Sequence, residues 1–318
     1  PEHKRLRNLL AQAFTPKVSE AMRPIAHEVV TRQISNLSTS SDLIRDVFIP
    51  VPALVVGRLL GSSEDDIPDL IRWAGAINGL YEKGGLIDPN KAIYAEKMLE
   101  EIRQFVTRLA GHRRALRIKG KLDPTQDVLA GLVSVETDGD SLSDSELLST
   151  VVTLFVAGHE TTTHLLGNGM LALLRSDSEL KRIQGNFELI PKAIDEMARF
   201  DGSVPRSWRI TKRQMEILGV QIPQGELVLP ILSAANRDES VFEDPDVFNI
   251  SRDTRKHLAF GRGVHVCLGA PLARIEGQEI IKQLLTKFPN ISLNAKESEL
   301  VWRKDVALRG LESLPVLL

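Results

Sequence analysis

The stretch Phe260-Gly261-Arg262-Gly263-Val264-His265-Val266-Cys267-Leu268-Gly269-Ala270-Pro271 carries the strongest signal in this sequence. It holds the only cysteine of the chain, set among glycines and just before a segment that Pro271 can open as a helix. Glycines permit positive φ and a close approach of the backbone to a flat or bulky group. Free N–H groups and the dipole at a helix N-terminus favour a thiolate over a thiol. The pattern predicts that Cys267 is a metal ligand or a nucleophile, against the alternative of a small buried hydrophobe.

The composition limits the class of protein around this loop. The chain has 318 residues, of which 42% are hydrophobic and 26% charged, enough to bury a large core. Its 40 Lys and Arg against 42 Asp and Glu leave a net charge of −2, so we expect no nucleic-acid ligand. No apolar run approaches the roughly 18 residues of a membrane helix, and one cysteine excludes an internal disulfide. We expect a cytoplasmic protein without a membrane partner.

Hydrophobic spacing predicts a mainly α-helical chain with small β-sheets, an α+β fold in one domain over residues 1–318. Thr15-Pro16 is typical of a helix start, and Ser143-Asp144-Ser145-Glu146 is a capping box that opens a long helix through about Leu174. Further helices are expected at 44–60 with breaks at Pro50 and Pro52, and at 70–80, 95–109, 187–200 and 271–288. Short strands are expected at 208–211, 215–218 and 226–232, before an irregular stretch at 236–265. Because the chain starts on a proline within helical sequence, we expect that an N-terminal portion is lacking.

The cysteine loop resembles the haem-binding loop of the cytochromes P450, in which a cysteine thiolate ligates the haem iron. Ala157-Gly158-His159-Glu160-Thr161-Thr162 resembles the acid–alcohol motif of that family, and Glu196-Met197-Ala198-Arg199 resembles its Glu-x-x-Arg motif. The resemblance covers nearly the whole chain and is closest to soluble bacterial enzymes that tailor polyketides. The first strands and helices of the family have no counterpart in this sequence.

The resemblance implies a haem-thiolate monooxygenase with haem b, which inserts one oxygen atom of O2 into an apolar or amphipathic small molecule of secondary metabolism. Cys267 would ligate the iron, and Glu160 and Thr161 would handle protons, with the Thr161 hydroxyl placed to bond the Ala157 carbonyl. The residues expected at the cofactor are His3, Arg7, Ala157, Gly158, Arg209, Phe260, Gly261, His265, Cys267 and Gly269. Of these, His3, Arg7, Arg209 and His265 would hold the propionates. The expected substrate wall is Thr153, Val156, Val204, Pro205, Val306 and Ala307.

Glu196 and Arg199 are expected to serve folding as an ion pair with the irregular stretch. Their spacing is not specific by itself, because Glu2/Arg5, Glu20/Arg23, Glu100/Arg103 and Glu179/Arg182 share it. Most such pairs are solvated and contribute a few tenths of a kcal/mol. Glu196/Arg199 has the order and context of the family, since it follows the acid–alcohol helix and precedes the small strands and the cysteine loop.

No flavin or iron–sulfur module is encoded, so electrons would come from a ferredoxin or flavodoxin with its reductase, acting on a monomer. An acidic donor would dock on the cysteine side, at Lys4, Arg5, Arg255, Lys256 and Arg262. Two alternatives stay open. One is a peroxide-driven haem-thiolate peroxygenase, although relatives of that kind lose the acid–alcohol pair. The other is a non-catalytic haem-binding protein or an inactive fragment.

Overall fold

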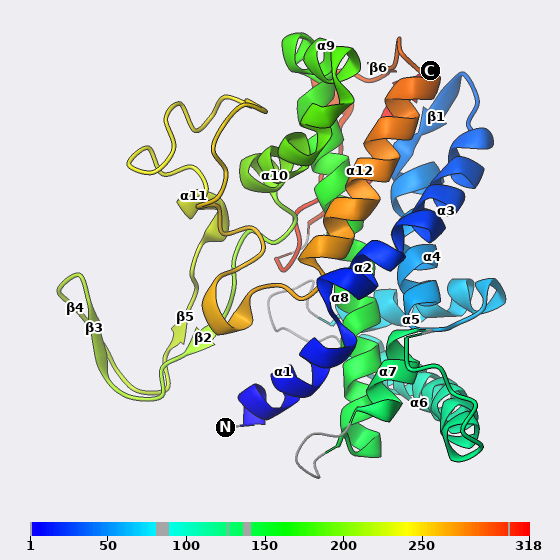
Figure 1. Ribbon diagram of the computed structural model, residues 1–318. Helices are drawn as coiled ribbons and strands as arrows, with labels where there is room; N and C mark the ends of the chain where they lie inside the picture. The colour runs from blue at the N-terminus through cyan, green and yellow to red at the C-terminus, as the bar shows by residue number, and fades with distance from the viewer. Residues whose placement is uncertain (1, 81–88, 126, 136–140, 305) are drawn as a thin grey trace.

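The computed structural model describes residues 2–80, 89–125, 127–135, 141–304 and 306–318. In these ranges the chain is mainly helical with small sheets, as the hydrophobic spacing predicts (Figure 1). The α-helices are α1 (Glu2–Ala13), α2 (Pro16–Ala21), α3 (Arg23–Ser35), α4 (Pro50–Leu59), α5 (Ile67–Asn78), α6 (Pro89–Ile118), α7 (Val128–Ser134), α8 (Asp144–Leu174), α9 (Asp177–Gly185), α10 (Ile190–Asp201), α11 (Leu232–Ala235) and α12 (Ala270–Lys287). The strands are β1 (Ser40–Asp42), β2 (Arg209–Ile210), β3 (Met215–Ile217), β4 (Val220–Ile222), β5 (Leu227–Val228), β6 (Ser292–Leu293) and β7 (Pro315–Leu317).

Two helices begin where local sequence predicts. The Thr15 side chain accepts a hydrogen bond from the Val18 N–H at 3.2 Å and caps α2. At the start of α8, Ser143 Oγ accepts from the Glu146 N–H at 3.3 Å, and Glu146 Oε2 accepts from the Ser143 N–H at 2.8 Å. This reciprocal pair satisfies N–H groups that a helix start leaves without partners, so the predicted capping box is confirmed.

Of three expected helix and strand boundaries, one is confirmed and two differ from the structure. A π-helix at Ile44–Phe48 precedes α4, which starts at Pro50, so the expected break at Pro50 is confirmed. The expected break at Pro52 is wrong, because this proline lies in the first turn of α4, where its missing N–H costs no helical hydrogen bond. The strand expected at 226–232 is limited to β5, and Leu232 starts the short helix α11.

The sheets join distant parts of the chain. Strand β7 pairs antiparallel with both β1 and β6, so Ser40 lies opposite Leu317 near the end of the sequence. Strands β2 and β5 form a second antiparallel pair. Strands β3 and β4 form a third, a hairpin that reaches away from the helices (Figure 1).

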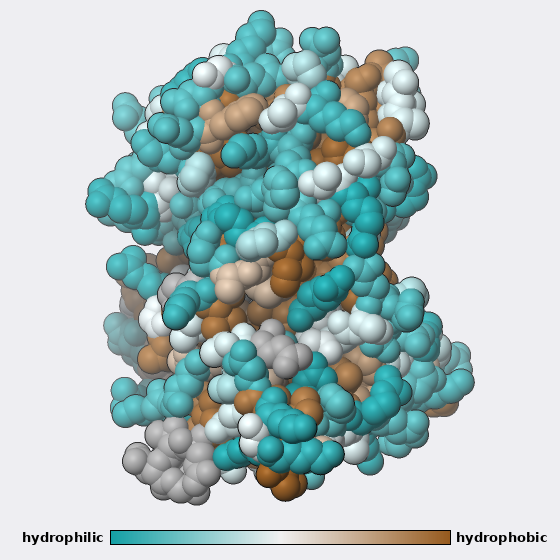
Figure 2. Space-filling model, turned by 45° about the vertical axis from the view of Figure 1, so that its right-hand side comes forward, coloured by the Kyte–Doolittle hydropathy of each residue, from teal (hydrophilic) through white to brown (hydrophobic). Residues whose placement is uncertain are grey.

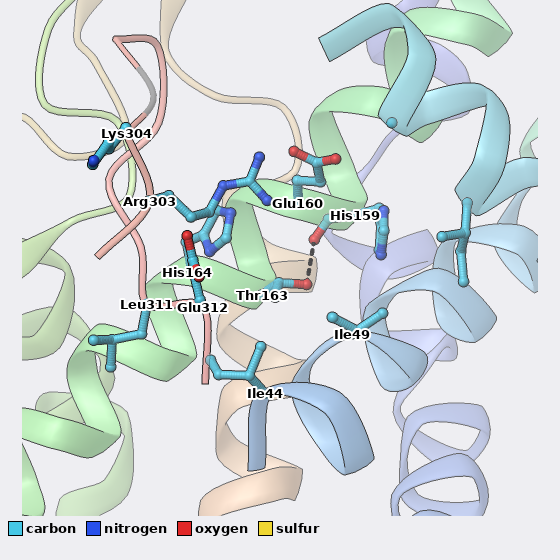
Figure 3. A pocket seen from close by; sticks show the side chains of 12 residues that line it. Ile44, Ile49, His159, Glu160, Thr163, His164, Arg303, Lys304, Leu311 and Glu312 are labelled. Atoms are coloured by element: carbon cyan, nitrogen blue, oxygen red, sulfur yellow. Dashed lines mark hydrogen bonds between the residues drawn. The ribbon is translucent and has the colours of Figure 1, made fainter. Parts of the chain in front are cut away.

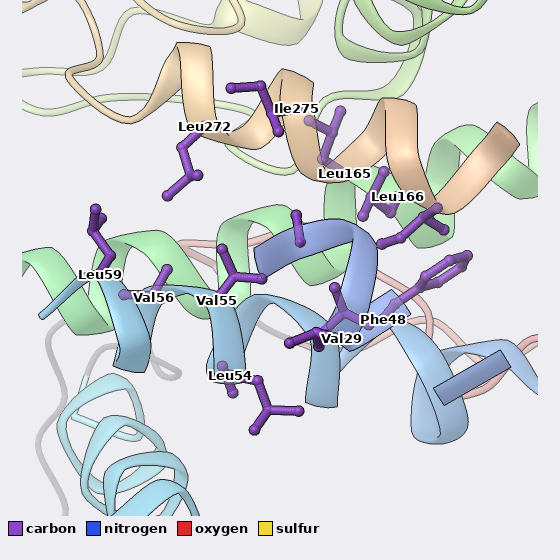
Figure 4. Close-up of a cluster of buried hydrophobic side chains, with 14 of the residues drawn as sticks. Val29, Phe48, Leu54, Val55, Val56, Leu59, Leu165, Leu166, Leu272 and Ile275 are labelled. Carbon is purple, nitrogen blue, oxygen red and sulfur yellow. The ribbon is translucent and has the colours of Figure 1, made fainter. Parts of the chain in front are cut away.

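Helix α8 runs through the centre of the helical part (Figure 1) and contacts α4, α5, α6, α10 and α12. Side chains of α3, α4, α8 and α12 meet in the core cluster of Figure 4. Gly158 allows one of these contacts, because a Cβ at this position would lie 3.0 Å from the Val56 side chain of α4. The face drawn in Figure 2 is largely hydrophilic, with hydrophobic side chains showing in several separate places. None of the helices that the structure describes is both long and apolar enough to cross a membrane.

The expected ion pair lies in the core. Arg199 donates to Glu196 through Nε at 2.7 Å and Nη2 at 2.8 Å, and both side chains are fully buried. Arg199 Nη1 also donates to the carbonyls of Asn236 and Pro245 at 2.8 and 3.0 Å, while Glu196 accepts from the Asn249 N–H at 3.0 Å. The pair therefore ties α10 to the irregular stretch 236–265, whose backbone has few partners in helices or strands.

Glu276 of α12 is a buried carboxyl group, 1% exposed, and neither of its oxygens has a hydrogen-bond partner among the described residues. Burial raises the pKa of this carboxyl well above its usual value. Above the unfolded-state pKa, folding must therefore take up a proton, and stability falls as the pH rises toward the folded-state pKa by about 1.4 kcal/mol per unit. Glu276→Gln should remove this dependence and raise stability progressively above pH 5.

Urea unfolding between pH 4 and pH 8 measures the effect, with the exposed Glu239→Gln as the matched control. Equal pH slopes for Glu276→Gln and the unsubstituted protein would show that the carboxyl is solvated or paired in solution.

Candidate haem site

The backbone around Cys267 closes into a tight loop. The Cys267 N–H donates to the Phe260 carbonyl at 2.8 Å, and between them Gly261 and Gly263 adopt φ values of +68° and +70°. These are left-handed conformations that favour glycine. Gly269 does not need this freedom, since its φ is −80°, but a Cβ there would lie 3.9 Å from the Cys267 sulfur. The expectation of positive φ is thus confirmed at Gly261 and Gly263, whereas Gly269 has neither a positive φ nor a contact closer than ordinary van der Waals distance.

Cys267 precedes α12 by three residues and is exposed to solvent. Enough protein surrounds its sulfur that desolvation raises the pKa of the thiol, whereas hydrogen bonds from the backbone of Gly269 and Ala270 lower it, as do the charges of Arg7 and Arg274. The helix N-terminus therefore lowers the pKa of Cys267 as expected, but desolvation has the larger effect. The predicted preference for a thiolate is wrong for the chain without a metal. A coordinated metal ion would remove the thiol proton outright.

Phe260 is fixed at the start of the loop. The Arg274 guanidinium lies 4.6 Å from the centroid of the Phe260 ring, and Arg274 Nε donates to Asp195 at 2.7 Å. The centroid of the His257 ring lies 5.7 Å from that of the Phe260 ring. These contacts leave the loop attached to α10 and α12.

Four basic side chains, two from α1, one from β2 and one from the loop itself, meet at the loop. The rings of His3 and His265 are 4.3 Å apart, and Arg7 donates to the Val266 carbonyl at 2.6 Å. Desolvation lowers the pKa of His265, and the charges of His3, Arg209 and Arg7 lower it further. Arg209 is exposed on β2. A cluster of like charges is unfavourable by itself, so it suits an anionic ligand.

Helix α8 presents one exposed stripe although most of its second half is buried. Thr153 and Ala157 are exposed and Thr161 is half-buried, and these residues are spaced four apart on one face. The Thr161 hydroxyl donates to the Ala157 carbonyl at 2.5 Å, as the sequence predicts. Helix α8 continues without a break past Thr161.

The other expected substrate residues fall into two groups. Val156 lines a small apolar cavity of about 20 Å³ between α8, α5 and α6, away from the exposed stripe. Val204, Pro205, Val306 and Ala307 are half-buried, and the two segments are joined by the Arg309 N–H, which donates to the Ser203 carbonyl at 2.8 Å. The structure therefore groups the strand-side and tail residues and gives Val156 and Gly158 packing contacts of their own.

Sequence reasoning missed two histidines of α8. His159 is 3% exposed and stacks on Phe155 with ring centroids 5.8 Å apart. His164 is 2% exposed and lies against Gly310, where a Cβ would overlap its ring. The spacing of Phe155, His159 and Thr163 along one helix face was the available signal.

The residues at this site fit haem. Cys267 offers a sulfur ligand, and the four basic side chains offer partners for two carboxylates. The exposed apolar side chains of Val264 and Val266, 71% and 43% exposed, lie in the same loop. Bound haem would supply the activation of dioxygen, to which a thiolate ligand contributes electron density.

A thiol ligand, a basic cluster and a helix with an acid–alcohol pair define a haem-thiolate protein. The family profile described as "Cytochrome P450" matches residues 87–306. Cytochrome P450 107B1 of Saccharopolyspora erythraea is 37% identical over 319 residues, covering 99% of this chain and 75% of that protein. The chain therefore belongs to the cytochrome P450 family; it is a monooxygenase, and its cofactor is haem b.

Solved structures agree with this assignment. The structure of PksS, a cytochrome P450 of the Bacillus subtilis bacillaene polyketide synthase, has a TM-score of 0.92 at 34% identity and covers 100% of this chain and 79% of that chain. P450BioI in complex with an acyl carrier protein ligated to hexadec-9Z-enoic acid has a TM-score of 0.90 at 33% identity, with 100% and 79% covered.

Proposed function

We propose that this chain inserts one oxygen atom of O2 into a C–H or C=C bond of an amphipathic small molecule in secondary metabolism. Two electrons from an external donor and two protons reduce the other oxygen atom to water. The observation that carries the proposal is the Thr161 hydroxyl, bonded to the Ala157 carbonyl on the exposed stripe of α8 and adjacent to Glu160. Cys267 would ligate the iron, and His3, Arg7, Arg209 and His265 would hold the propionates.

Two features support the proposed substrate class: the expected substrate wall and the similar proteins. Thr153 and Ala157 on the stripe combine one hydroxyl with an apolar surface, and Val204, Pro205, Val306 and Ala307 add apolar surface. One similar protein belongs to a polyketide synthase, and another was solved with a fatty acid on a carrier protein. We therefore propose a long-chain or polyketide-derived molecule. A peroxide-driven reaction ranks second. Peroxide-driven relatives lose the acid–alcohol pair, whereas this chain has both Glu160 and Thr161.

Thr161→Ala should leave the haem spectrum unchanged and divert electrons from product to hydrogen peroxide. The hydroxyl is the group on the stripe that can hold and pass a proton next to Glu160, and positioned proton transfer contributes about 10²–10⁴ to a rate. We expect product per electron to fall at least about tenfold. The measurement compares product, peroxide and NADPH consumption with a surrogate ferredoxin and reductase.

Thr286→Ala near the end of α12 is the matched control, because it removes a hydroxyl that donates to the carbonyl four residues back, that of Lys282, at 2.7 Å. It should keep the electron yield. An unchanged yield in Thr161→Ala would remove the proton-relay role. Equal turnover with peroxide alone would favour the peroxygenase, and no turnover with either oxidant would favour a non-catalytic haem protein.

The electron donor would approach the cysteine side through exposed cations. Arg5 pairs with Glu2 and Glu146, and Arg255 pairs with Asp253 at 2.6 Å. These ion pairs weaken the field of both arginines. The remaining exposed cations of the expected patch are Lys4, Lys256 and Arg262.

Lys256→Glu with Arg262→Glu should slow reduction by an acidic ferredoxin about tenfold at low ionic strength, within the 10–10³ that steering supplies. The difference should shrink as salt is added, because exposed charges are screened. Stopped-flow reduction measures it. Arg103→Glu on α6 with Lys119→Glu just after this helix makes the same change of charge elsewhere and should have little effect. Salt-independent reduction in both double variants would place docking on an apolar contact.

A further inference from the structure

One carboxylate beside the cysteine loop faces two nitrogen-bearing side chains. Asp195 of α10 accepts a hydrogen bond from Arg274 Nε of α12 at 2.7 Å, and His257 Nε2 lies 3.9 Å from the same Asp195 oxygen. The side chains of Arg274 and Asp195 are 33% and 30% exposed, and that of His257 is largely buried. Because water only partly surrounds the Asp195–Arg274 pair, its charges act over a longer range than charges on the open surface.

Arg274 is held in place from two directions. Asp195 binds one edge of its guanidinium, and the Phe260 ring lies 4.6 Å away, within reach of an attraction between a cation and an aromatic face. Two such contacts give the charge of a long, flexible side chain a fixed position beside the loop. Desolvation raises the pKa of the Cys267 thiol, and the charge of Arg274 opposes that shift. The positive charge of Arg274 is therefore felt at the sulfur.

His257 supports the loop without depending on the charge of Asp195. Its Nδ1 accepts a hydrogen bond from the Ala259 N–H at 3.1 Å, so the ring carries its N–H at Nε2, on the side of Asp195. The separation of 3.9 Å is too long for a hydrogen bond, and the contact is electrostatic. Ala259 directly precedes Phe260, whose carbonyl accepts from the Cys267 N–H. An uncharged side chain at position 195 would therefore leave this support of the loop intact.

The three groups lie apart from a polar cavity of about 530 Å³ beside α8 (Figure 3). The described lining of this cavity comes from four segments: α8, with His159 and His164 among its side chains, the segment 44–49, α5 and residues 303–312. Asp195, His257 and Arg274 are not among these lining residues. Water that enters the cavity therefore does not surround the Asp195–Arg274 pair, and its screening does not cancel the field of the pair at the loop.

We propose that Asp195 and Arg274 are positioning residues that together set the reduction potential of the haem iron. The proposal rests on the ligation of that iron by Cys267. Uptake of one electron from the external donor adds one negative charge at the site, so a fixed cation nearby favours the reduced state and a fixed anion opposes it. Arg274 raises the potential, and Asp195 lowers it by neutralising part of the Arg274 charge.

The test compares Arg274→Gln with Asp195→Asn in the haem-loaded protein without substrate. Each substitution removes one charge and leaves a polar side chain of similar reach. Arg274→Gln should lower the reduction potential and Asp195→Asn should raise it, each changing the ratio of ferrous to ferric haem at a fixed potential by at least about threefold. The double variant should return close to the unsubstituted protein, because both charges are then gone.

A spectroelectrochemical titration measures the potential, and the spectrum of the reduced carbon monoxide complex shows whether each variant keeps the thiolate ligand. Arg274→Lys retains the charge and should lie closer to the unsubstituted protein than Arg274→Gln does. The matched controls are Arg72→Gln and Glu101→Gln. This pair joins α5 to α6 at 2.7 Å, with side chains 38% and 33% exposed, and its variants should leave the potential unchanged.

Shifts in the same direction for Arg274→Gln and Asp195→Asn would overturn the proposal, because a loosened loop gives that result and a pair of opposite charges does not. Shifts no larger than those of the controls would also overturn it. If Arg274→Gln does not retain haem, the rise expected for Asp195→Asn still decides. Since no substrate is used, failure of oxygen insertion would contradict the proposed function alone. Absence of the thiolate band in the unsubstituted protein would remove the ligation by Cys267 and this proposal with it.

Discussion

Cys267→Ser should abolish the red-shifted absorption band that reduced thiolate-ligated haem gives with carbon monoxide. A serine hydroxyl is not a thiolate, and Cys267 is the only cysteine of the chain, so no second thiolate can replace it. The basic cluster of His3, Arg7, Arg209 and His265 is untouched by this change. We therefore expect haem to be bound at reduced affinity, with a carbonyl spectrum that lacks the thiolate band altogether.

Val264→Ala is the matched control, since Val264 lies three residues away in the same loop with its side chain 71% exposed. It should keep the band. Persistence of the band in Cys267→Ser would falsify the assignment of the iron ligand.

Arg199→Met should cost about 3–5 kcal/mol of the free energy of unfolding, enough to leave little folded protein at 37 °C. The substitution leaves the Glu196 carboxylate in the core, fully buried and without its cation. It also removes the donors that hold the carbonyls of Asn236 and Pro245. Chemical unfolding measures the change. Arg199→Lys should lose less stability than Arg199→Met but more than none, because lysine keeps the charge but not the two-pronged geometry.

Arg103→Met is the matched control. Arg103 pairs with Glu100 at 3.5 Å in the same i,i+3 spacing, but both side chains are more than half exposed. We therefore expect this substitution to lower the free energy of unfolding by less than about 1 kcal/mol. Equal losses from the two substitutions would mean that burial does not set the strength of the pair.

Helices with local signals could be predicted from the sequence. The capping box at Ser143 and Glu146 and the cap at Thr15 depend on neighbouring residues alone, so their helices begin where expected. Leu232 could not be assigned in this way, since a four-residue helix there depends on contacts with α10 that its own spacing does not encode.

The candidate site was predictable in its residue types but not in its environment. The cysteine loop and the basic residues carry recognisable spacing, yet whether desolvation or the helix N-terminus sets the pKa of Cys267 depends on how much protein surrounds the sulfur. The helix-face spacing with Phe155 was the one signal for His159, and His164 had none, because the burial of both rings depends on Phe155, on Gly310 and on the walls of a cavity built by four separate segments.

The five Glu-x-x-Arg pairs separate the two sources of information. The sequence by itself determined that each glutamate meets its arginine, since residues three apart share a helix face, and all five pairs form. Only the tertiary structure decided that Glu196 and Arg199 are buried, because α10 packs on α8 and α12 and the irregular stretch 236–265 accepts the remaining hydrogen bonds. The same chemical pair is a solvated contact on α6 and a core element on α10, since the free energy of an ion pair depends on the water around it.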